Sequence, residues 1–196
     1  MSGAFALVAA LALAPGSASR VLGAPSSSAD GGRVRETPAA REQARLCERL
    51  DGDEAVDACR AALRLGIGPA RRGPLRELLA RRLVALERWS ELADLYRESV
   101  QLDPKNAEAW QRLGSTLLFA LNLAAEAVAA LQQAVRLAPA DAVSHLTLGL
   151  ALAAVRRPDD AVAELLAAER LDPTVFEGRP AAREALAAAR EGRPWP

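Results

Sequence analysis

Histidine is almost missing from this sequence, since only one of its 196 residues, His145, is a histidine. Acid–base and metal sites need several mutually placed groups. No His-Glu-x-x-His, Walker, dinucleotide-binding or Cys-x-x-Cys pattern accompanies this imidazole. The sequence therefore predicts a chain that is not an enzyme, with no catalytic residue, no cofactor and no metal ligand, and His145 is expected to pack between helices.

An excess of one charge is also missing, because 25 Lys and Arg residues balance 25 Asp and Glu residues. The arginines are interleaved with acids and form no basic stripe, so binding to nucleic acid or to an anionic membrane is not indicated. Aromatic side chains make up only 4% of the sequence. This composition is typical of one soluble helical domain.

The N-terminal apolar run is too short to span a bilayer. It covers residues 4–14, which is 11 residues, whereas a spanning helix needs about 20. Its length, with the small residues Gly16 and Ala18 behind it, predicts a secretory signal peptide at 1–18 and export to the periplasm or the medium. Residues 19–38 are rich in Ser, Gly, Pro and charge, which predicts a disordered linker. The alternative is an alanine-rich terminus of a cytoplasmic protein, because no Lys or Arg precedes the run.

A stretch of the sequence is present in two clear copies, Asn106–Pro139 and Asp141–Pro173. The period from Ala127 to Ala161 is 34 residues, and one extra residue lies near Leu121-Asn122-Leu123. The alignment places Leu113-Gly114 on Leu148-Gly149, Leu117 on Leu152, Ala127 on Ala161, Leu131 on Leu165, Ala134 on Ala168, Leu137 on Leu171 and Pro139 on Pro173. A fainter copy precedes them, with Leu79-Ala80 in place of the Leu-Gly pair and with Pro104 at its end.

Each copy predicts two helices, because its apolar residues recur at spacings of three and four. Gly114 and Gly149 lie inside helical patterns despite a propensity cost of about 1 kcal/mol relative to Ala, which indicates close packing against the second helix. Proline ends each second helix. Asn106 and Asp141 are expected to cap the helices that follow.

The pattern Trp110-x2-Leu113-Gly114-x2-Leu117, followed by Ala127-x3-Leu131, Ala134 and Pro139, resembles the tetratricopeptide repeat. The resemblance covers Gly73–Pro173 and implies an all-α fold of tandem helix-turn-helix repeats, stacked as a right-handed α-solenoid. The repeats are expected at 73–106, 107–141 and 142–175. The third copy departs from the family pattern with His145 at the Trp position, and the first departs with Arg76 there and with Leu92 and Ser99 at the Ala positions.

The ends of the array are expected to be covered by further helices, because an open stack would expose an apolar face. Residues 39–70 repeat the spacing weakly and predict a degenerate N-terminal helical pair. Residues 178–196 predict a C-terminal capping helix and tail, which includes Trp195. The positions expected to pack the helices together are Trp110, Leu113, Gly114, Ala127, Ala134, Pro139, Leu148, Gly149, Ala161, Ala168 and Pro173.

Two cysteines, Cys47 and Cys59, fall on the two predicted helices of the N-terminal pair. In an antiparallel hairpin, residues equally far from the turn are neighbours. Cys47 lies five residues before Gly52 and Cys59 seven after it, so the register permits a bridge without requiring one. An exported protein meets an oxidising compartment in which a disulfide is favoured. The alternative is two buried thiols that act as small apolar residues.

The resemblance implies a non-catalytic interaction module that holds a protein or peptide in a groove lined by the first helix of each pair. Carried over by position, this groove comprises Glu77, Arg81, Val84, Gln111, Ser115, Leu118, Phe119, Leu146, Leu150 and Ala153. An amphipathic helix or apolar extended segment is the expected ligand, because the row becomes apolar along the chain. Two alternatives stay open: packing within the array covers these side chains, or the chain is an accessory subunit of an exported or envelope complex.

Overall fold

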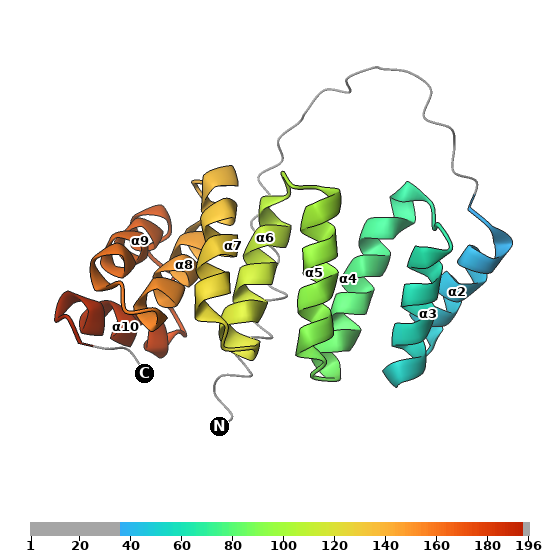
Figure 1. Cartoon of the computed structure of the whole chain (residues 1–196), viewed down its shortest axis with the longest axis horizontal. Helices are drawn as coiled ribbons and strands as arrows, with labels where there is room; N and C mark the ends of the chain where they lie inside the picture. The colour runs from blue at the N-terminus through green and yellow to red at the C-terminus, as the bar shows by residue number, and fades with distance from the viewer. Residues whose placement is uncertain (1–35, 194–196) are drawn as a thin grey trace, which may run out of the picture. The chain divides into compact units, whose positions relative to one another are not determined.

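The computed structural model describes residues 36–193, which fall into two compact units that divide between Leu92 and Ala93, inside one helix. The predicted signal peptide, most of the predicted linker and Trp195 lie outside the described residues. The helices of the first unit, drawn in blue and green in Figure 1, are α2 (Pro38–Arg49), α3 (Gly52–Arg64), α4 (Pro69–Ala85) and the start of α5 (Trp89–Leu102).

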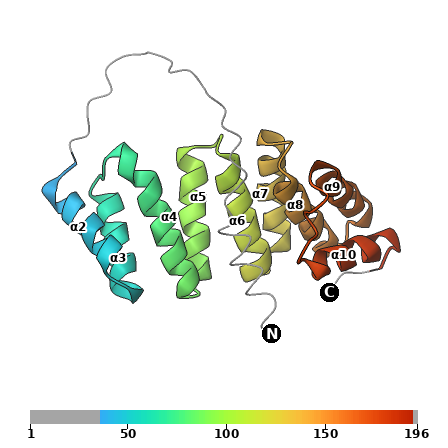
Figure 2. The same ribbon diagram turned by 180° about the vertical axis from the view of Figure 1, so that it is seen from behind.

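The second unit contains the rest of α5 and two helical hairpins with a final helix. Its elements are α6 (Ala107–Ser115), a π-helical turn η1 (Thr116–Ala120), α7 (Ala124–Leu137), α8 (Ala142–Ala154), α9 (Pro158–Leu171) and α10 (Pro180–Arg190). Helix α7 packs on α6 and α8, α9 packs on α8, and α10 contacts both α8 and α9, as Figure 2 shows from behind. Every regular element between residues 36 and 193 is a helix, so the predicted all-α class built from tandem helix-turn-helix repeats is confirmed.

Side-chain caps start the first helices of the two clear repeats. Asn106 accepts a hydrogen bond from the backbone N–H of Ala109 at 2.9 Å, and Asp141 accepts one from Ser144 at 3.1 Å. Each cap satisfies an N–H group that has no partner within its helix. Both predicted N-caps are confirmed.

In each of the two clear repeats, a leucine side chain of the second helix packs directly over a glycine of the first helix. A Cβ atom on Gly114 would lie 2.4 Å from Cγ of Leu131, and one on Gly149 would lie 2.6 Å from Cγ of Leu165. At Gly149 the carbonyl oxygen of Ala161 is also only 3.2 Å away. The glycines therefore make room mainly for a leucine side chain, and only at Gly149 for backbone as well.

The remaining repeat-packing positions differ in burial according to their place in the hairpin. Six are buried, namely Leu113, Ala127, Ala134, Leu148, Ala161 and Ala168. Trp110 is half-buried, and Pro139 and Pro173 are exposed where each second helix has ended.

His145 makes a hydrogen bond to a proline carbonyl oxygen that is equivalent to the one Trp110 makes one repeat earlier. The indole Nε1–H of Trp110 donates to the carbonyl oxygen of Pro104 at 3.0 Å, and Nε2 of His145 lies 3.1 Å from the carbonyl oxygen of Pro139. Nδ1 of His145 also lies 2.6 Å from Glu164 on α9. His145, which lies on α8, therefore contacts both the turn before α8, at Pro139, and helix α9, at Glu164.

The extra residue of the middle repeat is absorbed by η1. The N–H of Leu123 reaches back six residues to the carbonyl of Leu117, whereas in the third repeat Arg157 reaches back five residues to Leu152. The turn residues with positive φ occupy equivalent positions, because Asn122 lies five residues before Ala127 and Arg156 lies five residues before Ala161. The insertion therefore lies in the last turn of the first helix, between 118 and 121. This range overlaps the expected location, near Leu121-Asn122-Leu123, at Leu121.

A disulfide joins α2 and α3, with Cα atoms of Cys47 and Cys59 4.7 Å apart. Both side chains have 0% exposure. The bridge crosses a hairpin whose turn contains Gly52, at φ 63°. The N-terminal pair is thus held by a covalent link as well as by apolar packing.

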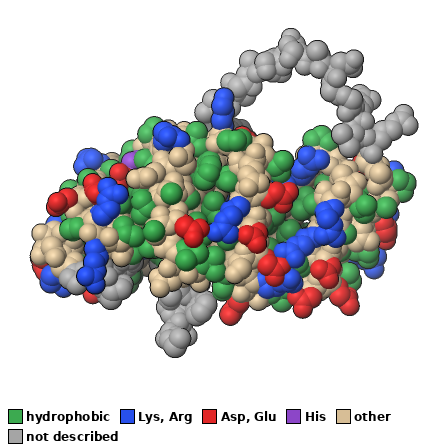
Figure 3. Space-filling model, in the orientation of Figure 1, with side chains coloured by type: hydrophobic (Ala, Val, Ile, Leu, Met, Phe, Trp, Pro, Cys, Tyr) green, Lys and Arg blue, Asp and Glu red, His purple; other side chains and the backbone are tan. Residues whose placement is uncertain are grey.

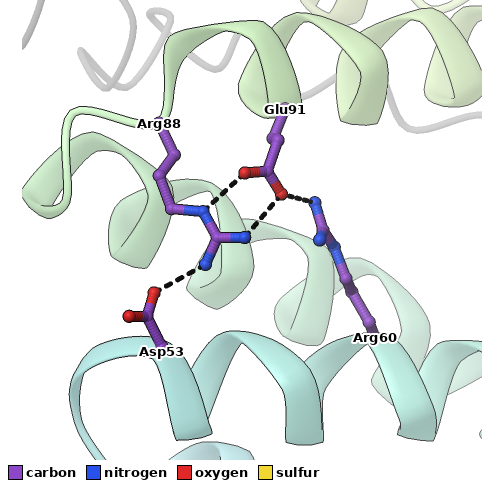
Figure 4. A network of polar contacts seen from close by, with 4 residues as sticks. All are labelled: Asp53, Arg60, Arg88 and Glu91. Atoms are coloured by element: carbon purple, nitrogen blue, oxygen red, sulfur yellow. Dashed lines mark hydrogen bonds and ion pairs between the residues drawn. The ribbon is translucent and has the colours of Figure 1, made fainter.

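An ionic network ties α3 to the start of α5 (Figure 4). Arg88 donates to both oxygens of Glu91, at 2.5 and 2.8 Å, and to Asp53 at 2.7 Å, while Arg60 pairs with Glu91 from the other side. The hydrogen bonds from Arg88, followed by those from Arg60, hold the pKa of Glu91 below its usual value of 4.5, although burial opposes the shift. The hydrogen bonds to Glu91, together with the charge of Asp53, raise the pKa of Arg88, although burial opposes the shift.

The connection between α9 and α10 is a turn with its own polar anchor. Asp172 accepts hydrogen bonds from the hydroxyl of Thr174 at 2.7 Å and from its backbone N–H at 2.9 Å, and these lower the pKa of Asp172. Val175 and Phe176 follow as buried residues, and α10 begins at Pro180. The end of the array is thereby covered by α10.

We expect Gly114→Ala to destabilise the protein by roughly 1 to 3 kcal/mol, because the added methyl group overlaps Leu131. Gly73→Ala is a matched control, since its helical site has nothing within 4 Å of an added Cβ and should be neutral or stabilised by up to about 1 kcal/mol. Urea unfolding measures both free energies. Equal effects of the two substitutions would contradict the Leu131–Gly114 contact.

Reduction of the Cys47–Cys59 disulfide should lower the free energy of unfolding by about 3 kcal/mol, the chain-entropy value for a loop of this length. Alkylation of the unfolded, unreduced protein followed by mass spectrometry should find no modified thiol. Two modified thiols in protein taken from an oxidising compartment would rule out the bridge and weaken the case for export.

Glu91→Gln should cost stability at pH 7 and progressively less as the pH falls. The folded pKa of Glu91 is below the ordinary 4.5, so its contribution is complete above about pH 4.5 and is lost as the pH drops through the folded value. Unfolding free energies at pH 7, 5, 4 and 3 test this against Glu54→Gln, an exposed control on α3. A gap between wild type and Glu91→Gln that stays constant over this range would refute the role of the carboxylate.

Candidate functional site

The residues predicted to line a groove lie on first helices in both units. Glu77, Arg81 and Val84 lie on α4; the first and last are half-buried and Arg81 is exposed. The other seven belong to the second unit and are called the α6–α8 face: Gln111, Ser115, Leu118, Phe119, Leu146, Leu150 and Ala153. Since α6 and α8 contact each other, the structure brings these seven onto neighbouring helices.

The α6–α8 face lies to one side of the glycine contacts. At 100° per residue, Leu146 and Leu150 are about 60° and 100° around α8 from Gly149, which itself faces α9. Gln111 and Ser115 stand at the same angles from Gly114 on α6. The two helices therefore present equivalent sectors beside their contacts with the second helices.

Burial separates Phe119 from the other members of the face. Gln111 is 7% exposed, Ser115 0%, Leu118 6%, Leu146 0%, Leu150 1% and Ala153 6%, whereas Phe119 is half-buried. These values fit the alternative from the sequence, in which packing within the array covers these side chains. In this structure, Phe119 is the part of the face that a partner can touch first.

The polar content of the face is one hydrogen-bonded pair without charge. Nε2 of Gln111 donates to Oγ of Ser115 at 2.9 Å, one turn apart on α6. The adjacent Arg112 is turned to Glu108, to which its Nη2 donates at 2.6 Å. The face is therefore apolar, with two groups that can form hydrogen bonds.

On the side of the molecule that Figure 3 shows, acidic and basic side chains lie beside one another with apolar ones between them. No group of three or more His, Cys, Asp or Glu residues within 36–193 could hold a metal ion.

Sequence reasoning missed one feature of this site. It carried Leu118 and Phe119 over by position as residues of a regular helix, but η1 contains both residues. The signal was present, since the middle repeat is one residue longer than the third. Sequence reasoning left open whether the side chains of Leu146 and Leu150 are covered, and both are buried.

A family model for the tetratricopeptide repeat matches residues 73–116, and a second model of the same description matches residues 107–141. No curated protein sequence matches the chain. Solved structures share its fold: the MamA protein is 21% identical, with 79% of this chain and 82% of that chain covered and a TM-score of 0.64.

Two further structures are similar at comparable coverage. YrrB, a TPR protein with an unusual peptide-binding site, is 22% identical over 79% of this chain and 83% of its own, with a TM-score of 0.53. A thermophilic TPR protein from Thermus thermophilus is 24% identical over 78% and 82%, with a TM-score of 0.51. The chain therefore contains tetratricopeptide repeats over residues 73–141 and shares the fold of these tetratricopeptide-repeat proteins.

Proposed function

We propose that the chain is a non-catalytic interaction module that binds a peptide or protein segment on the α6–α8 face. The observation that carries this proposal is an uncharged face on the first helices of two consecutive repeats. It is polar at Gln111 and Ser115 and apolar at Leu146 and Leu150, and Phe119 lies at its accessible edge. YrrB has a peptide-binding site on a similar fold, which supports the same class of function here.

The chemistry of the face selects the kind of ligand. Leu146 and Leu150 stand where a cation would be needed to hold a carboxylate, so the ligand is an apolar segment and not an acidic chain terminus. Phe119 is the large apolar side chain of the face that is only half-buried, and burying it fully would contribute up to about 1.5 to 3 kcal/mol.

The proposed location is outside the cytoplasm, in the periplasm or the medium. A disulfide such as Cys47–Cys59 persists in an oxidising compartment. Within residues 36–193, no helix has the length and apolar character of a membrane span.

A second candidate function is an accessory subunit of a larger complex. Three leucines at equivalent positions near the ends of second helices, Leu102, Leu137 and Leu171, are 59%, 37% and 43% exposed. A partner could bury them together, because exposed large apolar side chains that recur in this way favour an interface.

Photo-crosslinking distinguishes the two candidates. Benzoylphenylalanine at position 119 should give an adduct in the native extract, and the crosslinked peptide should be an apolar segment. The same group at position 171 is the matched control, because Leu171 is exposed and lies on a second helix. Adducts at 171 without any at 119 would reject the α6–α8 face and support the accessory subunit.

Phe119→Glu should reduce retention of that crosslinked partner at least tenfold, because a charge enters the accessible edge of an apolar face. Retention is measured with purified partner on immobilised protein, after circular dichroism has shown unchanged helix content. Charges at Ser115 or Leu150 are less informative, since both side chains are fully buried and a charge there would unfold the unit. Unchanged retention by Phe119→Glu would count against the proposed surface.

A further inference from the structure

His145 faces an oxygen atom with each of its two ring nitrogens. Nδ1 lies 2.6 Å from a carboxylate oxygen of Glu164 on α9, and Nε2 lies 3.1 Å from the carbonyl oxygen of Pro139. A carbonyl oxygen only accepts hydrogen bonds, and so does an ionised carboxylate. A neutral imidazole has one N–H group and an imidazolium has two, so both contacts are hydrogen bonds at once only when the pair carries the extra proton.

The middle repeat has no ionisable group at the two equivalent positions. Trp110 donates its indole N–H to the carbonyl oxygen of Pro104 at 3.0 Å, and the position of Glu164 is taken by Ala130, 34 residues earlier. The contact with a proline carbonyl oxygen is therefore common to both repeats. Its dependence on a proton is particular to the third repeat.

The charged groups on the elements packed around α8 have partners of their own or are exposed. Asp141, in the turn before α8, accepts hydrogen bonds from the backbone N–H and the hydroxyl of Ser144. On α6, Glu108 and Arg112 pair with each other. The acids and bases of α7 and α10, and those of α9 other than Glu164, are exposed. Glu164 is therefore the charged group in contact with the ring.

We propose that His145 is a pH-sensitive link in the second unit: with both nitrogens protonated it ties α8 to α9 and to the turn at Pro139, and when neutral it releases the turn. The neutral ring keeps its proton on Nδ1, because a hydrogen bond to a carboxylate is stronger than one to a carbonyl oxygen. The side chain of His145 is only 12% exposed, so water has little access to the contact that is lost. The stability that His145 contributes is therefore complete at the acidic end of the imidazole titration and falls as the pH rises through it.

The first test compares wild type with His145→Trp/Glu164→Ala, which copies the middle repeat and keeps an N–H group for the carbonyl oxygen of Pro139. Urea unfolding is measured at pH 5.5, 7.0 and 8.5, above the ordinary carboxyl pKa of about 4.3. Between pH 5.5 and 8.5, the unfolding equilibrium constant of wild type should rise at least about fivefold relative to that of the double variant. No other imidazole contributes, because His145 is the only histidine of the sequence. A ratio that changes less than about twofold, or that changes in the opposite direction, would overturn the inference.

The second test reads the ring directly and needs no variant, so it decides the matter even if the double variant does not fold. Nitrogen-15 NMR of wild type without a histidine tag should show protons on both ring nitrogens at pH 5.5 and on Nδ1 alone at pH 8.5. The signals belong to His145, since the sequence has no other histidine. A neutral ring that carries its proton on Nε2 would overturn the inference, because the contact with Pro139 would then persist and the one with Glu164 would be lost.

Discussion

The packing of a leucine side chain over a helical glycine sets the geometry on which the rest of the second unit depends. Leu131 fills the space above Gly114, and Leu165 fills the space above Gly149, at distances that leave no room for a Cβ atom. The contact draws each pair of helices together and fixes the rotation of the first helix. That rotation decides which side chains face the second helix and which form the adjacent sector. The α6–α8 face is therefore a consequence of the packing, not an independent element.

Much of this framework could be predicted from the sequence, because its signals are local. The glycines inside helical patterns, the caps Asn106 and Asp141 and the prolines after each second helix all follow from spacing and backbone chemistry. His145 was expected to pack, and it makes the hydrogen bond of the Trp110 that it replaces. These features need no knowledge of distant contacts.

The unpredicted features depend on choices that the sequence pattern leaves open. One extra residue between Leu117 and Leu123 could have lengthened the turn, but the positive-φ turn is kept and the last helical turn becomes η1. π-helical turns of this kind are frequently found at functional sites. Here, η1 contains Leu118 and Phe119. The sequence pattern also left open whether Leu146 and Leu150 are covered, and both side chains are buried.

A double-mutant cycle on Gly114 and Leu131 tests the central claim most directly. If the leucine occupies the place of the missing Cβ atom, then Leu131→Ala makes room for Gly114→Ala. The double variant should then be more stable than the sum of the two single changes predicts, by about 1 kcal/mol or more. Urea unfolding of the four proteins measures this coupling. Additive effects within about 0.3 kcal/mol would contradict the account, because independent residues cannot set the distance between the helices.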